Sequence, residues 1–131
     1  MQTFLPYPDF NDSLACLDYR RLGKQRVEAK QILSALGKGS GGWYNHPATR
    51  MWAGHESALA LYHDLAIEHW VKRGYNNTMQ KLNPKVVLFP PWLGQDQFHS
   101  THRAALLQKD FNHYSQFSWT ESPKIEYIWP I

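Results

Sequence analysis

The sequence predicts an all-α fold, a single compact domain over residues 1–131 built from three main helices and long ordered loops. Apolar residues recur at helical spacing in three separate stretches. Residues that commonly begin helices, either capping residues or a proline, stand before each stretch. The short apolar run Val86–Phe89 lies outside them and is cut off by two prolines, which disfavours a paired strand.

The first predicted helix begins near residues 11–13 and ends at Gly37. Residues 11–13 read Asn-Asp-Ser, and all three favour the N-cap position. The glycine is followed by a flexible connection, KGSGG, at residues 38–42. Inside this helix, Gly23 is expected to produce a kink or a break.

Two further helices are predicted. One runs from Pro47, a residue suited to the first helical position, to Lys72. The other runs from about Ser100 to Lys109. The tail, residues 111–131, is rich in aromatic residues and carries few regular signals.

The composition is that of a folded protein with a mild preference for polyanions. Hydrophobic residues make up 43% and charged residues 19%, as in an ordinary globular domain. Aromatic residues make up 15%, enough to leave some rings free to stack on bases. The formal charge of +3 favours partners such as nucleic acid.

Cysteine usage and hydropathy indicate the compartment. Cys16 is the single cysteine, so no internal disulfide can form, which suits a reducing environment. No stretch approaches the ~20 apolar residues that a membrane helix needs, and the first residues do not read as a signal segment. We expect a cytoplasmic monomer with no membrane partner.

The most informative stretch is residues 17–33, LDYRRLGKQRVEAKQIL. Five cations lie within eleven of its residues, with Glu28 as the single carboxylate among them. On a helix, Arg21, Lys24 or Gln25, and Glu28 share one side, because residues three and four positions apart are neighbours.

Two interpretations of this face are open. It is either a solvated helix surface on which Glu28 pairs with Lys24, a contact worth little, or a phosphate-binding lip that holds a carboxylate near a nucleic-acid backbone. Arg20 and Arg26 widen the lip in the second interpretation. The aromatic and histidine residues elsewhere in the chain favour it.

Two further groups of residues fit a nucleic-acid interface. At the start of the second helix, His46 and Arg50 stand beside backbone N–H groups that attract anions, and Trp43 is a candidate stacking ring. The other group opens the third helix and consists of His99, His102 and Arg103. Its histidines lack companions at a familiar zinc spacing, so we expect no metal and no other cofactor. If the helices bundle, all these groups line one groove.

Several stretches resemble the pyrimidine-dimer DNA glycosylases, the phage endonuclease V-like family. They are LDYRRLGKQRVE, NHPATRMW, EHWVKRGYN, PPWLG with FH and THRAALLQKD, and a terminal YIWP. Together they span nearly the whole chain. The resemblance is most specific for a bacterial and phage branch that opens MQTFLPYPDF.

The resemblance implies an all-α, endonuclease V-like domain that kinks duplex DNA and flips a base out of the stack. Members attack the sugar C1′ with the N-terminal α-amine, form a Schiff base and cleave the strand by elimination, assisted by a helix-borne Glu. Met1 is the matching amine here, because the large Gln2 is expected to keep Met1 in place. Aligned on YR–L, the family's Glu falls on Arg21. Glu28, seven residues further along the same face, is the nearest carboxylate, and we infer that it takes the acid–base role.

The predicted function is therefore that of a DNA glycosylase, with or without AP-lyase activity, acting on a damaged or modified base. Two alternatives remain open: a non-catalytic nucleic-acid-binding module on the same scaffold, and an enzyme for a free nucleotide or another anionic small molecule. Arg21 at the family's Glu position favours the alternatives, and Glu28 among the cations favours an enzyme. The residues expected to hold phosphates are Arg20, Arg21, Lys24, Arg26, Arg50 and Arg103.

Overall fold

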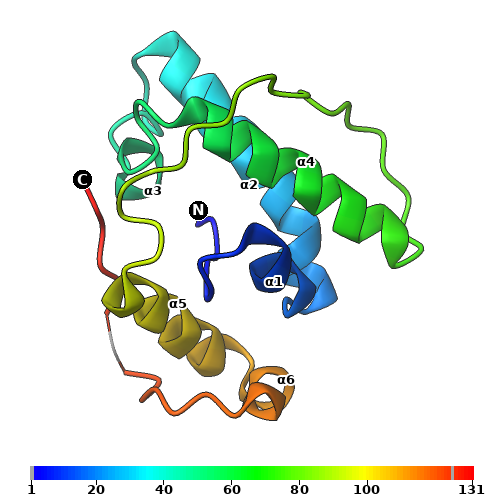
Figure 1. Cartoon of the computed structure of the whole chain (residues 1–131), viewed down its shortest axis with the longest axis vertical. Coiled ribbons are helices and arrows are strands. Elements are labelled where there is room, and N and C mark those ends of the chain that lie inside the picture. Colours follow the sequence, from blue (N-terminus) through cyan, green and yellow to red (C-terminus); the bar gives the residue numbers. More distant parts are fainter. Residues whose placement is uncertain (1, 125) are drawn as a thin grey trace.

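The computed structural model describes residues 2–124 and 126–131, and its regular elements are helices (Figure 1). In chain order they are α1 (Phe10–Ala15), α2 (Tyr19–Lys38), α3 (Pro47–Arg50), α4 (Glu56–Lys72), α5 (Asp96–Lys109), α6 (Phe111–Tyr114) and the 3-10 turn η1 (Ser115–Phe117). The described residues contain no strand, so the all-α prediction is confirmed, with α2, α4 and α5 as the three main helices. None of the helices in these ranges has both the length and the apolar character needed to cross a membrane.

The first predicted helix is two helices in the structure. Residues 16–18 separate α1 from α2, and the break does not lie at Gly23. Asp18, which precedes α2, has an extended backbone (φ −64°, ψ 160°). Its N–H donates to the hydroxyl of Tyr114 over 3.1 Å. The two residues are 96 positions apart, so no local pattern announces this break.

Gly23 continues α2 and makes room for α4 instead of kinking the helix. The two helices pack along each other (Figure 1). A Cβ atom at residue 23 would lie 2.9 Å from two ring atoms of Trp70. The glycine therefore permits a close approach between α2 and α4.

The second and third predicted helices differ from the observed ones at their starts. The helix at Pro47 stops after four residues, and a turn follows in which Gly54 takes a left-handed conformation (φ 81°). The long helix α4 begins only at Glu56. The third helix starts at Asp96 and not at Ser100, since an acidic residue in the first turn is favoured by the helix dipole.

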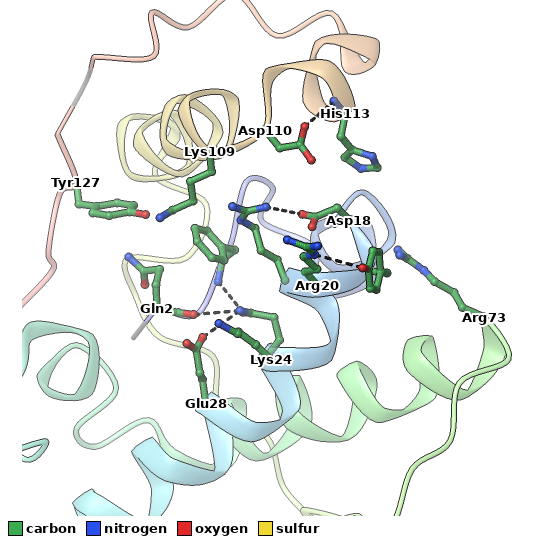
Figure 2. A pocket seen from close by; sticks show the side chains of 14 residues that line it. Gln2, Asp18, Arg20, Lys24, Glu28, Arg73, Lys109, Asp110, His113 and Tyr127 are labelled. Carbon is green, nitrogen blue, oxygen red and sulfur yellow. Dashed lines mark hydrogen bonds and ion pairs between the residues drawn. The ribbon is translucent and has the colours of Figure 1, made fainter.

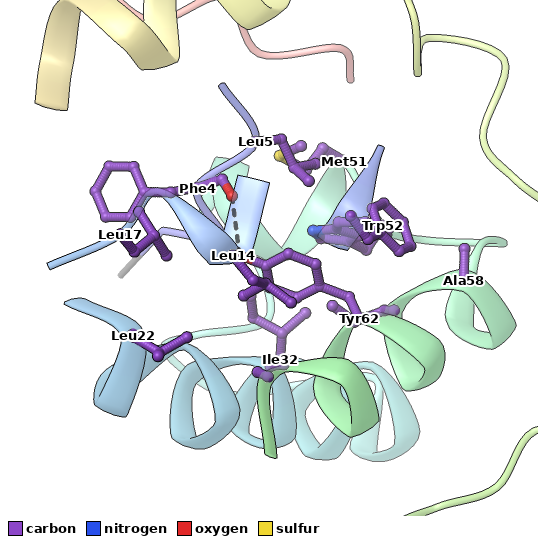
Figure 3. Packing of buried hydrophobic residues seen from close by; sticks show 14 of the residues in the cluster. Phe4, Leu5, Leu14, Leu17, Leu22, Ile32, Met51, Trp52, Ala58 and Tyr62 are labelled. Carbon is purple, nitrogen blue, oxygen red and sulfur yellow. Dashed lines mark hydrogen bonds between the residues drawn. The ribbon is translucent and has the colours of Figure 1, made fainter. Parts of the chain in front are cut away.

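The hydrophobic core lies between α2 and α4 and reaches the N-terminal segment (Figure 3). Leu22 and Ile32 of α2 and Tyr62 of α4 are fully buried. Phe4 and Leu5 pack on them from the extended start of the chain. The core therefore includes a segment that belongs to no helix.

That segment, residues 2–5, is buried. Its backbone forms hydrogen bonds with side chains of the helices, whereas an extended segment in a sheet would form them with a neighbouring strand. On the α2 side, the Phe4 N–H donates to Gln25 Oε1 (2.8 Å), and Gln25 Nε2 donates to the Gln2 carbonyl (3.1 Å). The hydroxyl of Tyr62 lies 2.6 Å from Gln25 Oε1 and 2.9 Å from the Phe4 carbonyl. One buried glutamine thus joins the segment to both long helices.

On the α5 side, two histidines enclose the backbone of Leu5. Its N–H donates to His102 Nδ1 (2.8 Å), and its carbonyl accepts from His99 Nδ1 (2.7 Å). His99 Nε2 accepts from the Gly94 N–H (2.9 Å), which leaves the proton of this neutral ring on Nδ1. The N-terminal segment is held between α2 and α5 in this way (Figure 1).

Replacing Gly23 with alanine is expected to destabilise the protein. The new methyl group meets the Trp70 ring at 2.9 Å, and overpacking of this kind costs about 1–3 kcal/mol. That cost outweighs the gain of about 1 kcal/mol that alanine brings to a helix interior. Gly37→Ala is the matched control, because an added Cβ there has no atom within 4 Å, and it should stabilise. Chemical denaturation measures both, and a gain in stability for Gly23→Ala would contradict the packing argument.

Candidate functional site

One face of α2 forms a wall of a large open pocket of about 1100 Å³ (Figure 2). The N-terminal segment lies beside this face. Other parts of the pocket come from the end of α4, the junction of α5 and α6, and the C-terminal segment. The lining residues are Gln2, Phe4, Asp18, Tyr19, Arg20, Arg21, Lys24, Gln25, Glu28, Arg73, Lys109, Asp110, His113 and Tyr127.

Positive charge prevails in the pocket. Five cations and three carboxylates line it, and the cations come from α2, from the end of α4 and from the end of α5. Cations that converge from separate elements on an open concave surface suit a phosphate backbone. They are Arg20, Arg21, Lys24, Arg73 and Lys109.

Glu28 is partly buried in this basic pocket and has no cationic partner among the described residues. Its Oε2 accepts a hydrogen bond from Gln25 Nε2 (3.3 Å). Lys24 is exposed and lines the same pocket, yet it does not form the ion pair expected of a plain solvated face. Burial raises the pKa of the Glu28 carboxyl above its ordinary value, so its protonated form is favoured more than in a free glutamate.

Asp18 lies in the same pocket in a contrasting environment. Partial burial acts to raise its pKa, but hydrogen bonds from Tyr114 and Arg21 outweigh burial, and the pKa of Asp18 is lowered. Arg21 Nη1 lies 3.2 Å from Asp18 Oδ1, and the Tyr114 hydroxyl donates to the same oxygen. Asp18 therefore stays ionised, and its charge partly neutralises Arg21.

The pocket thus contains two carboxyl groups whose pKa values are shifted in opposite directions. Such a pair is typical of sites where one acid exchanges a proton while the other remains charged. Asp18 is occupied by Arg21 and Tyr114. Of these two, Glu28 has no cationic partner among the described residues and is therefore the one available to give or take a proton.

A row of three aromatic rings ends at Tyr19, which lines the pocket. Trp70 stacks on Tyr75 with ring centroids 4.3 Å apart, and Tyr75 stacks on Tyr19 at 6.2 Å. The guanidinium of Arg20 lies over the Tyr19 ring, and that of Arg26 lies over Trp70 at the other end. Tyr19 is 51% and Tyr75 40% exposed, so flat rings suited to base stacking lie next to the cations. Arg26 itself does not line the pocket.

The predicted group at the start of the second helix lies at α3, and none of its members lines the pocket. His46 caps α3 with its own side chain. Its ring centroid lies 5.6 Å from that of Trp43 and 6.1 Å from that of Trp129. The Arg50 guanidinium lies over the ring of Tyr44. The residues at α3 that were expected to share one groove with the cations of α2 therefore lie outside this pocket.

The group at the third helix is structural. His99 and His102 are buried around Leu5, where an anion in solvent cannot reach them. Burial lowers the pKa of His102 to about 3, so its ring is neutral and accepts the Leu5 N–H. Arg103 donates to Glu121 and to the Pro6 carbonyl. This placement argues against the predicted role of the three residues in nucleic-acid binding.

Met1, the predicted source of the amine, lies outside the described residues. Gln2, its neighbour in the sequence, lines the pocket. The Gln2 carbonyl and the Glu28 carboxylate both accept from Gln25 Nε2. In the part of the chain that the structure describes, no cluster of histidine, cysteine or acidic side chains is arranged to hold a metal ion.

Sequence reasoning missed the pocket residues that come from the second half of the chain. Lys109 stands in the last turn of α5, where cations are common for electrostatic reasons, so nothing distinguished it from an ordinary helix end. Asp110 and Tyr127 stand in two of the stretches that resemble the family, THRAALLQKD and YIWP, but no pattern in the sequence gave either residue a role in a site. Tyr114 stood out only as one aromatic residue among many, although it determines the state of Asp18.

Comparison with family models gives a match over residues 1–83 to the family described as pyrimidine dimer DNA glycosylase. The match covers more than half of the chain and includes α1 to α4. It supplies the α2 face of the pocket and Arg73, whereas the residues from Lys109 onward lie beyond it. No curated protein and no solved structure matches the chain.

The depressed pKa of His102 predicts a loss of stability in acid. The unfolded chain takes up a proton at this ring below pH about 6.5, whereas the folded chain does so only near pH 3. The stabilisation is complete above pH about 6.5 and is lost as the pH falls toward 3, so this ring alone should cost up to about 2 kcal/mol between pH 7 and pH 5. NMR titration of the His102 ring measures the shift, and a midpoint near pH 6 would show that the ring is not held neutral by burial.

Proposed function

The chain belongs to the pyrimidine dimer DNA glycosylase family, and from this membership we propose that it is a base-excision enzyme acting on a damaged or modified base in duplex DNA. The observation that carries the proposal is Glu28, a partly buried carboxyl group without a cationic partner among the described residues, in a pocket lined by five cations. The cations suit the DNA backbone, and the carboxyl group suits proton transfer to a base.

The DNA backbone would lie across the cations of the pocket. Lys24 and Arg20 are exposed on α2, and Lys109 is exposed at the end of α5. A strand that passes between these two helices meets positive charge on both sides. Tyr19 lines the pocket, and Tyr75 stacks on it; these partly exposed rings are candidates for contact with bases exposed when the duplex is distorted.

Glu28 is proposed as the catalytic acid. When the bond from C1′ to the base breaks, its electron pair leaves with the base. Protonated Glu28 donates a proton to the departing base, and the carboxylate that results stabilises the positive charge on the sugar. Water then adds to C1′ and gives its proton back to the Glu28 carboxylate, unless an amine forms the new bond to C1′ instead. The raised pKa of Glu28 keeps more of the donor form available near neutral pH.

A lyase step requires an amine in addition to Glu28. We propose the α-amine of Met1 as this nucleophile, because such an amine has a pKa near 8 and is partly neutral at pH 7. Lys24 and Lys109 line the same pocket and are the competing amines. An imine formed on any of them is trapped by borohydride, and peptide mapping then identifies the residue.

Lys24→Ala is expected to weaken binding to duplex DNA several-fold and to lower the slope of log affinity against log salt by about 1, because one phosphate contact is lost. Lys30→Ala is the matched control, since Lys30 is exposed on the same helix but does not line the pocket. Titrations at about 50 and about 200 mM salt measure the slope. Wild-type affinity that does not depend on salt would remove the nucleic-acid interpretation and favour a small anionic substrate.

Glu28→Gln removes the charge of the side chain at nearly constant shape. Base release should fall by about 10²–10⁴-fold, as for loss of a general acid, while DNA binding holds or tightens because a negative charge has left the pocket. Duplexes with a thymine dimer and a panel of modified bases are the substrates, run with and without borohydride.

If the Glu28→Gln variant excises the base at the wild-type rate, the catalytic acid is another residue. Glu56 and Asp18 would be the next residues to test. Salt-dependent binding by a wild-type protein that excises nothing from the panel would support the non-catalytic module. That alternative is favoured by Arg21 at the position of the family's glutamate.

A further inference from the structure

Gln2 presents a buried amide that makes no hydrogen bond of good geometry among the described residues, and the hydroxyl of Tyr127 is its polar neighbour in the pocket. The Gln2 side chain is 6% exposed and lines the pocket. Neither Nε2 nor Oε1 has a hydrogen-bond partner among the described residues. Buried polar groups are almost always paired, and leaving an amide unpaired is costly. The donor and the acceptor of this amide are therefore unused, as expected of a group that hydrogen-bonds to a ligand.

The position of Gln2 is fixed by its backbone. Its carbonyl accepts from Gln25 Nε2, which also donates to Glu28 Oε2, over 3.1 and 3.3 Å. Gln25 Oε1 in turn accepts from the Phe4 N–H. Figure 2 shows Gln2 next to Glu28, on the side of the pocket that faces Tyr127. A ligand group bound by the Gln2 amide would thus lie close to the candidate catalytic acid.

A carboxamide offers one donor and one acceptor side by side. Each nucleobase presents an adjacent donor and acceptor on its Watson–Crick edge. An amide can bond such a pair at once, as glutamine does with N6 and N7 on the major-groove edge of adenine. Phosphate presents only acceptors, so it uses half of the amide. The unpaired amide therefore fits a base better than it fits the backbone.

We propose that Gln2 reads the hydrogen-bonding edge of a base extruded into this pocket and so places its bond to C1′ beside Glu28. The ring of Tyr127, half-buried in the same pocket, supplies a stacking face for that base. Gln2 is in this scheme a positioning and specificity residue. The inference rests on the proposed function, since it requires a DNA duplex in the pocket.

The test uses duplexes with one unpaired base, A, C, G or T, placed opposite a tetrahydrofuran abasic analogue so that the base is easily extruded. A duplex with the analogue on both strands is the base-free probe. The variant is Gln2→Met, which keeps the length of the side chain and a large residue after Met1. Gln31→Met is the matched control, because Gln31 is exposed on α2 outside the pocket.

Gln2→Met should bind the unpaired-base duplexes about tenfold more weakly than the wild type, as expected for loss of one bidentate base contact. It should bind the base-free duplex as the wild type does. Gln31→Met should leave both affinities unchanged. Equal loss on both kinds of duplex, or no loss on either, would overturn the assignment.

Gln2→Glu serves as a second variant that keeps the shape and removes the donor, so the inference stays testable if Gln2→Met fails to fold. It should change the order of affinity among the four bases, and an unchanged order would count against base reading. Failure of the wild-type protein to bind any duplex is a separate result, which overturns the proposed function and this inference with it.

Discussion

The fold depends on how the backbone of a buried, extended segment obtains its hydrogen bonds. Residues 2–5 lie inside the protein, where an unpaired peptide group costs about 1–3 kcal/mol. Gln25 of α2 bonds to the backbone of Gln2 and Phe4, and two histidines of α5 bond to that of Leu5. These side chains supply the hydrogen bonds that neighbouring strands supply in a sheet. They also connect the α2–α4 pair with the second half of the chain.

The same bonds shape the site, because Gln25 belongs to the core and to the pocket at once. Its amide is buried and holds the N-terminal segment, while its Nε2 also bonds to Glu28. The position of the candidate acid is therefore fixed by the contact that orders the start of the chain. Tyr114 has a corresponding role on the other side of the pocket, where it bonds to the backbone and to the carboxylate of Asp18. In both places a core contact determines the chemistry of a carboxyl group.

The sequence predicted the features that local periodicity encodes. The all-α class, the three main helices and the alignment of Arg21, Lys24 and Glu28 on one side of α2 all follow from spacing along a helix. The helix break before Asp18 and the burial of His99 were not predictable, because each depends on a residue more than 90 positions away in the chain. The sequence does not distinguish a histidine that binds an anion from one that hydrogen-bonds to a buried peptide group.

The pocket is assembled from two parts of the chain, of which the family match covers one. The wall with Glu28 falls within residues 1–83, which match the family, and the wall with Lys109 and Tyr127 lies beyond them. Tyr127 packs against the hydrophobic core, whereas Lys109 is exposed at the end of α5 and takes no part in that core. A change of Lys109 would therefore alter the charge of the pocket without repacking the helices that hold Glu28, so the electrostatics of the pocket and the stability of the fold can vary independently at this position.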